Sequence, residues 1–272
     1  MNMGKHIYHL AEASEPQLVG GKAFALGKMI QAGFTVPNGF VLSAATFLKM
    51  TPALENDLLQ AFDQLQTDVV AVRSSALSED GAEDAWAGQL DTFLNCTRST
   101  LLEHVQKCWQ SAGSARAKAY AAQKALRSTK VAVIVQAMIP SEISGVTFSV
   151  HPVTNDEGQM VIEAGLGLGE AIVSGEITPD TYIVDKHSGR CLEKHRAQQS
   201  KKLVRNHAGE TAWEEIGAAG QEQKLSDAQI SQLCSLTAKL ADFFGYPVDV
   251  EWAISKGVLY VLQCRPITTL AG

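Results

Sequence analysis

The feature that most constrains the fold of this chain lies near its C-terminus, where two apolar stretches flank a short turn sequence. Residues 248–254 and 258–263 alternate or run apolar on either side of Ser255-Lys256-Gly257. Short apolar runs around a glycine-containing turn are typical of a β-hairpin. The sequence therefore predicts two adjacent antiparallel strands in this part of the chain.

Three polar residues occupy this predicted hairpin. Gln263 and Arg265 are two positions apart, so their side chains lie on one face of the second strand. Pairing across the hairpin can bring Glu251 beside them. Carboxylate and amide oxygens can hold a hard cation, and a guanidinium can bind phosphate oxygens through paired hydrogen bonds. The trio suits a magnesium-nucleotide, although an ordinary surface ion pair at a strand end is the alternative.

The size and composition of the chain fit a folded protein with two lobes or two small domains. It has 272 residues, of which 46% are hydrophobic and 19% charged. The formal net charge of -6 argues against broad nucleic-acid binding, which needs a concentrated basic surface. Five cysteines without a Cys-x-x-Cys pair indicate reduced thiols. Neither a signal-peptide pattern nor a membrane-length apolar run occurs, so a cytoplasmic location without membrane contact is expected.

The pattern of apolar residues predicts a helical first lobe followed by a region rich in strands. Helices are expected directly after Gly20-Gly21-Lys22, over 43–50 and 52–65, within 101–126 and over 225–244. A short buried strand over 69–72 is expected to end at Arg73. Further strands are expected over 130–138, 145–149, 160–163, 181–185 and 191–198. The fold class predicted is α+β.

Cations and a glycine loop in the first half of the chain suggest phosphate binding. Lys22 follows two glycines at a predicted helix start, where backbone N–H groups are unpaired, although a solvated lysine after a turn is the common alternative. Arg73 follows a buried strand, and Gly88 stands in a loop that could expose backbone donors. Thr92 could add a hydroxyl.

Two other segments are candidates for lining a nucleotide site. The strand over 131–135 runs into Gln136-Ala137-Met138, where exposed backbone groups could read an adenine edge, although a plain core strand is the alternative. The glycine-rich stretch 165–170 lacks Gly-x-Gly-x-x-Gly spacing, which excludes a dinucleotide fingerprint and favours a loop that opens a short helix over 170–174. The basic cluster Lys201-Lys202 with Arg205 is expected to be solvated.

Taken together, the motifs resemble one family: the nucleotide-binding domain of phosphoenolpyruvate synthase, pyruvate phosphate dikinase and rifampin phosphotransferase. The matching motifs run in order along almost the whole chain. They are Gly20-Gly21-Lys22, Arg73-Ser74-Ser75-Ala76 with Glu79-Asp80, Ala87-Gly88-Gln89, Ser144-Gly145-Val146, Gly167-Leu168-Gly169-Glu170, Pro179-Asp180, and Leu262-Gln263-Cys264-Arg265-Pro266-Ile267-Thr268.

The resemblance implies an ATP-grasp fold, in which two α+β lobes hold ATP between them. Residues 1–272 would form one such domain, with a first lobe over about 1–128, a second over about 129–205, and a C-terminal helix and hairpin over about 222–268. The implied ATP contacts, extended to the neighbouring Met138, are Lys22, Arg73, Gly88, Thr92, Gln136, Met138, Glu251, Gln263 and Arg265. Lys22, Arg73 and Arg265 would be catalytic, and Glu251 and Gln263 would hold Mg²⁺.

The resemblance also sets an expectation about the phosphoryl acceptor. Members of the family carry a swivelling domain with a phosphorylated histidine in a Thr-Gly-Gly and Ser-His-Ala context, and none of the seven histidines stands in that context. The chain is therefore expected to pass phosphate to a histidine on a separate domain or partner chain. The alternatives are a stand-alone kinase or ligase for a small molecule, which would yield ADP rather than AMP, and a non-catalytic regulatory subunit.

Overall fold

The computed structural model describes residues 6–77, 91–114, 130–206 and 209–267. By its internal contacts the chain divides into two compact units, residues 1–138 and 139–272. Within the described ranges all pairings between the named strands are antiparallel. This mixture of helices with antiparallel sheets confirms the predicted α+β class.

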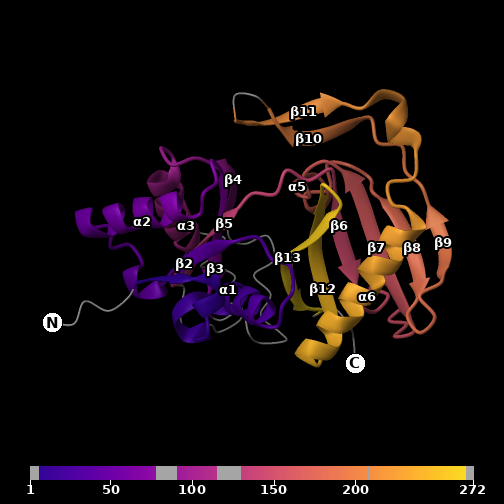
Figure 1. The fold of residues 1–272 in the computed structure, drawn as a ribbon, viewed down its shortest axis with the longest axis horizontal. Helices are drawn as coiled ribbons and strands as arrows, with labels where there is room; N and C mark the ends of the chain where they lie inside the picture. Colours follow the sequence, from indigo (N-terminus) through magenta and orange to yellow (C-terminus); the bar gives the residue numbers. More distant parts are fainter. Residues whose placement is uncertain (1–5, 78–90, 115–129, 207–208, 268–272) are drawn as a thin grey trace. The chain divides into compact units, whose positions relative to one another are not determined.

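The first unit is a five-stranded sheet with helices on both faces (Figure 1), in the strand order β1-β2-β5-β3-β4. Apolar side chains of α2 and α3 form a core with one face, and α1 contacts β3 and β5. Its elements are β1 (Ile7–His9), η1 (Leu10–Glu12), α1 (Pro16–Gln31), β2 (Gly39–Leu42), η2 (Ala44–Thr46), α2 (Pro52–Gln64), β3 (Val70–Ala76), β4 (Thr92–Cys96), α3 (Leu101–Ala112) and β5 (Val131–Ala137).

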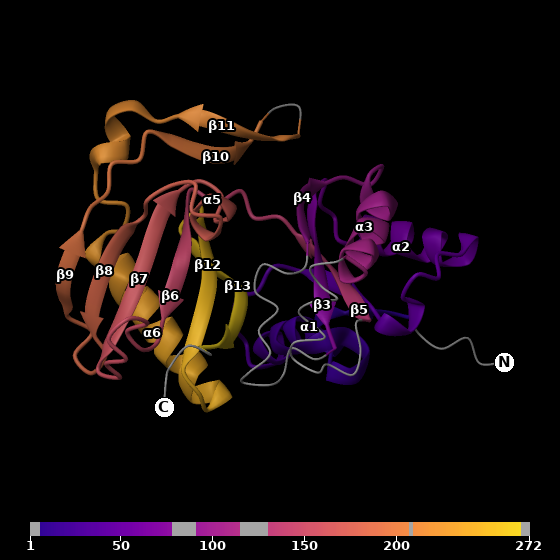
Figure 2. The ribbon, with the colours of Figure 1, turned by 180° about the vertical axis from the view of Figure 1, so that it is seen from behind.

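The second unit is a six-stranded sheet in the order β13-β12-β6-β7-β8-β9, with a separate two-stranded hairpin, β10-β11. Helix α6 packs on one face of the larger sheet (Figure 2). The elements are β6 (Ile143–Phe148), β7 (Gln159–Leu166), α5 (Glu170–Val173), β8 (Asp180–Asp185), β9 (Cys191–His195), β10 (Lys201–Arg205), β11 (Thr211–Glu215), η3 (Gly217–Gln221), α6 (Asp227–Phe244), β12 (Val248–Ser255) and β13 (Val258–Pro266).

The C-terminal hairpin has the predicted position and turn. Strands β12 and β13 are joined by Lys256 and Gly257, both with positive φ (49° and 75°). Such a two-residue turn matches the right-handed twist of the paired strands, and the glycine adopts the required conformation at no steric cost.

Two local predictions were wrong. The segment 43–50 forms only the 3₁₀ turn η2, because Leu48 has a φ of 59° and cannot continue a helix. Arg73 does not end its strand, since β3 continues to Ala76 in unbroken pairing with β5. The basic residues Lys201, Lys202 and Arg205 lie in strand β10.

The boundary between the two units lies after residue 138, whereas the sequence placed it near residue 128. Strand β5 lies between β2 and β3 in the first sheet, so the first unit extends through Met138.

Candidate nucleotide-binding site

The hairpin of the second unit brings together the three polar residues selected from the sequence. In the register of β12 and β13, Glu251 lies opposite Gln263, and Asp249 lies opposite Arg265. Residues two apart on a strand share a face, so all four belong to one face of the sheet. Trp252 and Ile254, of opposite parity on β12, pack in the core beneath α6. The polar row therefore lies on the face away from α6.

Asp249 is the residue of this row that the sequence reasoning missed. Its Oδ2 accepts a hydrogen bond from Arg265 Nε at 2.8 Å and forms an ion pair with Nη2 at 2.7 Å, while its Oδ1 is buried and has no hydrogen-bond partner among the described residues. Burial raises the pKa of the Asp249 carboxyl, the Arg265 charge opposes that rise, and Glu251 adds to it. Two features could have identified Asp249 from the sequence: it lies two residues before Glu251, and it pairs with Arg265 in the hairpin register.

Glu163 adds a further carboxylate to this face. It pairs with Val146 of β6, which in turn pairs with Glu251, so Glu163 and Glu251 are in one row across three strands. Burial raises the pKa of Glu163, and the charge of Asp249 raises it further. Among the described residues, no group of three or more His, Cys, Asp or Glu side chains is gathered as a metal site.

In the first unit, Lys22 is placed by a kink at Gly20. Gly20 interrupts α1 with a φ of 76°, and a Cβ there would lie 2.4 Å from Ser75 Oγ. The helix restarts beyond it, and Ala23 N–H donates to Ser75 Oγ at 3.2 Å, which satisfies one donor of the new first turn. Lys22 is therefore near a helix N-terminus, as predicted, and its half-buried Nζ donates to the Ser74 carbonyl oxygen at 3.4 Å.

Arg73, Gln136 and Thr92 lie close together on the sheet of the first unit. Arg73 pairs with Thr92 of β4, and its Nη1 donates to Gln136 Oε1 at 3.4 Å. The Arg73 side chain is buried in the face opposite the α2–α3 core, because Val70 and Val72 of the same strand pack in that core. Thr92 is exposed at this end of the sheet.

Gln136 takes part in this cluster through its side chain rather than only through its backbone. Its Nε2 donates to the Pro37 carbonyl oxygen at 3.4 Å. Met138 follows β5 and is half-buried, with its N–H donating to the Val69 carbonyl oxygen at 3.2 Å. Gly88 lies outside the described residues.

The comparison with protein families identifies the class to which this chain belongs. Residues 48–272 match the family described as "Pyruvate phosphate dikinase, AMP/ATP-binding domain". The chain therefore belongs to this family of nucleotide-binding domains, as its motifs predicted. Its two α+β units agree with the ATP-grasp fold that the resemblance implied.

The chain is also similar to individual proteins. The chain is 35% identical over 319 residues to a probable phosphoenolpyruvate synthase of Methanocaldococcus jannaschii, covering 98% of this chain and 27% of the relative. It is 33% identical over 311 residues to rifampicin phosphotransferase of Bacillus subtilis, covering 96% and 36%. A D-alanine–D-alanine ligase from Bacillus anthracis, solved with ATP, aligns at a TM-score of 0.42 with 9% identity, covering 95% of this chain and 58% of that one.

The chain spans about a third of the length of the curated relatives it matches. The relatives' names describe proteins that are much longer than this domain.

Among the described helices of this chain, none combines the length and apolar character needed to cross a membrane.

Proposed function

We propose that this chain binds Mg-ATP and passes a phosphoryl group from it to a histidine on a separate domain or partner chain. The observation that carries the proposal is the row of Asp249, Glu251, Gln263 and Arg265 on one sheet face, within a family of AMP/ATP-binding domains. This row offers both oxygen ligands and a phosphate-binding cation. Phosphoryl transfer depends mainly on positioning and charge neutralisation, which such groups can supply.

Glu251 and Gln263 would hold Mg²⁺, and Asp249 adds a further oxygen. The donor set fits this ion, because Mg²⁺ takes oxygen ligands and is usually bound by one or two carboxylates together with substrate phosphates. The unpartnered, buried Oδ1 of Asp249 fits a nearby cation too, since a carboxylate oxygen in such a position is costly without one. The bound ion would neutralise charge on the phosphate oxygens.

Lys22, Arg73 and Arg265 would supply the positive charges that bind the phosphates. Lys22 would contribute an ammonium at a helix start. Arg73 would contribute a buried guanidinium, which its hydrogen bond to Gln136 holds in place. Arg265 keeps exposed surface although it pairs with Asp249, with 38% of its side chain accessible. It can therefore contact a phosphate while remaining fixed by Asp249. Thr92, Met138 and Gly88 remain proposed nucleotide contacts.

The names of the full-length relatives suggest which acceptors the phosphoryl group could reach. Their names include phosphoenolpyruvate synthase and rifampicin phosphotransferase, so pyruvate-type and antibiotic acceptors are both compatible with the same ATP-binding domain. We place the acceptor choice in parts of the complete protein other than this domain.

The product of ATP turnover tests the proposal. The chain is incubated with Mg-ATP carrying a labelled β- or γ-phosphate, with and without a candidate phosphohistidine-domain protein. Partner-dependent formation of AMP is expected, with one of the two phosphates lost from ATP on the partner's histidine and the other released to water as inorganic phosphate. Partner-independent ADP with a phosphorylated small molecule would instead favour the kinase or ligase, and tight ATP binding without turnover under any condition would favour the regulatory subunit.

Variants of the polar row sharpen this test. Glu251→Ala and Arg265→Ala are each expected to abolish phosphoryl transfer while the fold survives. The matched control is Asp242→Ala, which removes an exposed carboxylate from α6, the helix on the other face of the sheet. Full transfer by both Glu251→Ala and Arg265→Ala would contradict the proposed roles.

A further inference from the structure

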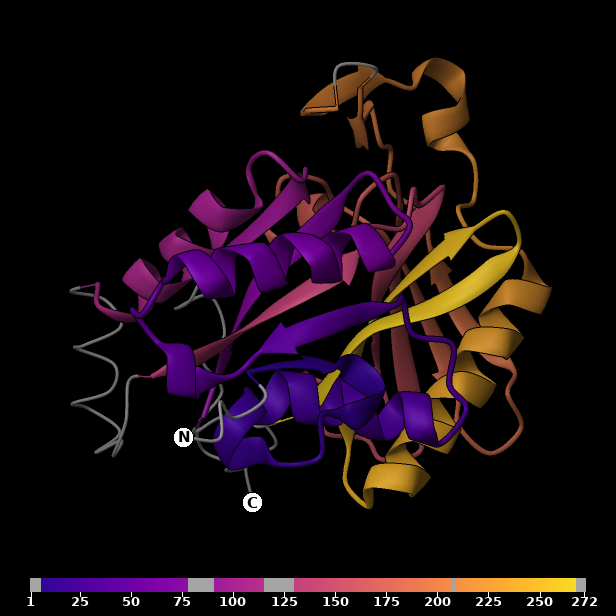
Figure 3. The ribbon, with the colours of Figure 1, turned by 60° about the vertical axis from the view of Figure 1, so that its left-hand side comes forward.

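Between β9 and α6 the chain leaves the large sheet of the second unit and forms a projecting arm. The arm, defined here as residues 197–224, contains β10, β11 and η3, and Figure 3 shows it standing away from the strands of its own unit. The sequence that forms it is short and polar, so it has little core of its own. Its attachment to the sheet therefore determines its orientation.

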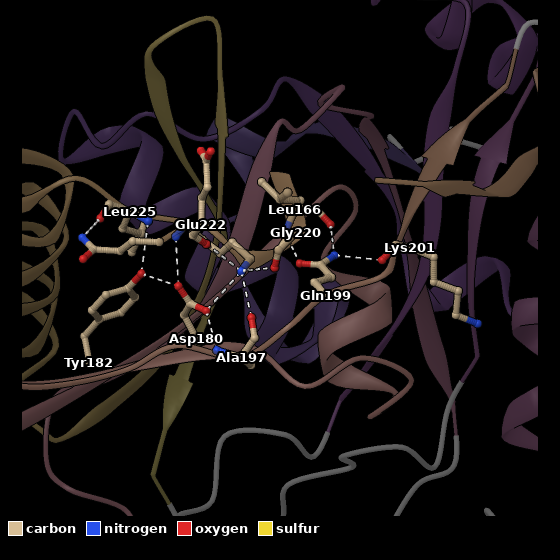
Figure 4. Close-up of polar contacts among 11 residues, drawn as sticks. Leu166, Asp180, Tyr182, Ala197, Gln199, Lys201, Gly220, Glu222 and Leu225 are labelled. Atoms are coloured by element: carbon tan, nitrogen blue, oxygen red, sulfur yellow. Dashed lines mark hydrogen bonds and ion pairs between the residues drawn. The ribbon is translucent and has the colours of Figure 1, made fainter. Parts of the chain in front are cut away.

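A buried carboxylate collects hydrogen bonds from both ends of this arm (Figure 4). Asp180, at the start of β8, is fully buried, and its Oδ1 accepts from the Ala197 N–H at 2.9 Å. Its Oδ2 accepts from the Lys224 N–H at 2.9 Å and from the Tyr182 hydroxyl at 2.8 Å. The same hydroxyl accepts from the Leu225 N–H at 3.1 Å. One side chain thus fastens the first and the last residue of the arm.

The ammonium of Lys224 completes this junction. Its Nζ lies 3.3 Å from Asp180 Oδ1 and donates to the carbonyl oxygens of Ala197 at 3.0 Å, Gly220 at 3.0 Å and Glu222 at 2.8 Å. The Lys224 and Asp180 side chains are 2% and 0% exposed. The ammonium therefore joins backbone from both ends of the arm inside the protein, away from solvent.

A second set of contacts ties the arm to β7, the strand that carries Glu163. The Gln199 side chain bonds to both backbone groups of Leu166: its Oε1 accepts from the Leu166 N–H and its Nε2 donates to the Leu166 carbonyl oxygen, both at 2.9 Å. The Leu168 N–H donates to the Leu203 carbonyl at 2.8 Å. A Cβ at Gly167 would lie 2.4 Å from that carbonyl oxygen, so only glycine permits this approach.

We propose that Asp180, Tyr182 and Lys224 form a lock that holds the arm in one orientation against the end of β7. A buried ion pair rarely adds net stability compared with apolar side chains of the same volume, but its directional bonds can select one arrangement. Here the backbone groups that bond to the pair all belong to the two ends of the arm. The lock would thereby position residues 166–169 at the end of β7, a consequence for catalysis that rests on the proposed function.

Hydrogen exchange followed by mass spectrometry on the full chain tests the lock directly. Asp180→Asn and Lys224→Met each remove one charge with little change in shape. In both variants the amides of β10 and β11 are expected to exchange at least about tenfold faster, while those of β6, β7 and β12 keep their wild-type rates. The double variant Asp180→Asn with Lys224→Met should show the same local effect without an unpaired buried charge.

The matched control is Lys194→Met. Lys194 pairs with Asp227 in the same unit, but in this pair the aspartate side chain is 82% exposed. Its loss should leave arm exchange unchanged. Wild-type exchange of the arm in a folded lock variant would overturn the proposal, as would a uniform increase over the whole unit or failure of all three lock variants to fold.

The exchange result and the proposed function can fail separately. Lock variants are titrated with Mg-ATP by calorimetry alongside the wild type. If the wild type does not bind ATP but the arm loosens as expected, the lock stands and the proposed function falls. If ATP binds the wild type and arm exchange is unaffected by the variants, the lock falls and the proposed function stands.

Discussion

Asp249 and Arg265 share one hydrogen-bonding arrangement: two guanidinium nitrogens contact the same carboxylate oxygen, Oδ2, at 2.8 and 2.7 Å. The other oxygen, Oδ1, is buried and without a hydrogen-bond partner in the described part of the chain. Arg265 is thereby held in a fixed orientation, and Asp249 keeps one oxygen available. This asymmetry supports the cation site that the proposed function places on this sheet face.

Arg265→Ala is expected to weaken Mg-ATP binding by about 10- to 100-fold, because it removes a charge-assisted contact to phosphate. Arg265→Lys should give an intermediate loss, since it keeps the charge but not the fork geometry. Isothermal titration calorimetry measures both effects. Wild-type affinity in the alanine variant would show that Arg265 does not contact the nucleotide.

Gly20→Ala is expected to lower the free energy of unfolding by about 2–4 kcal/mol. Gly20 has a φ of 76°, and the new Cβ would lie 2.4 Å from Ser75 Oγ and 2.5 Å from the Ser75 carbonyl oxygen. Gly33→Ala is the matched control: its φ is 83°, but its Cβ would meet nothing within 4 Å. This control should cost only about 1 kcal/mol. Urea denaturation compares the two, and equal losses would mean that contact with Ser75 is unimportant.

The hairpin and its polar row could be predicted because the information is local. Alternating apolar residues, a glycine turn and the spacing of Gln263 and Arg265 lie within a short stretch of sequence. The part played by Asp249 depends on the strand register, which the bulge after Glu251 also influences. A shift of one residue would have moved these side chains to the opposite face.

The arm and its lock could not be predicted from the sequence. Strands β10 and β11 alternate weakly and carry many charges, so their sequence resembles a solvated loop. Asp180 and Lys224 are 44 residues apart, and no periodic pattern indicates that they meet. The motif Pro179-Asp180 contributed to the family resemblance, but its physical role follows only from the packed structure.

Lys22→Met is expected to weaken ATP binding by about 10- to 100-fold, with the free energy of unfolding changed by less than about 0.5 kcal/mol. The side chain is only half-buried, and the long 3.4 Å contact with the Ser74 carbonyl adds little stability. Lys28→Met, on the exposed surface of the same helix, is the control and should bind ATP normally. Equal affinities for the two variants would exclude a nucleotide contact by Lys22.

Glu163→Gln is expected to stabilise the nucleotide-free protein at neutral pH. Burial and the nearby Asp249 charge raise the folded-state pKa of Glu163 above its unfolded value. Between these two pKa values the folded state binds more protons than the unfolded state, so stability falls as pH rises through that window. The wild type should therefore lose stability from the ordinary glutamate range upward, whereas the glutamine variant should lose less.

Thermal unfolding measured at several pH values checks this sign. The melting temperature of Glu163→Gln should exceed that of the wild type at pH 7, and the difference should vanish below the ordinary glutamate pKa of about 4.3. Glu157→Gln, a change at an exposed turn of the same unit, should follow the wild type. Because a bound cation favours the ionised carboxylates, Mg-ATP should reduce the advantage of the glutamine variant at pH 7. If the variant is less stable than the wild type at pH 7, the favourable interactions of the ionised Glu163 carboxylate outweigh the free-energy cost of burying its charge.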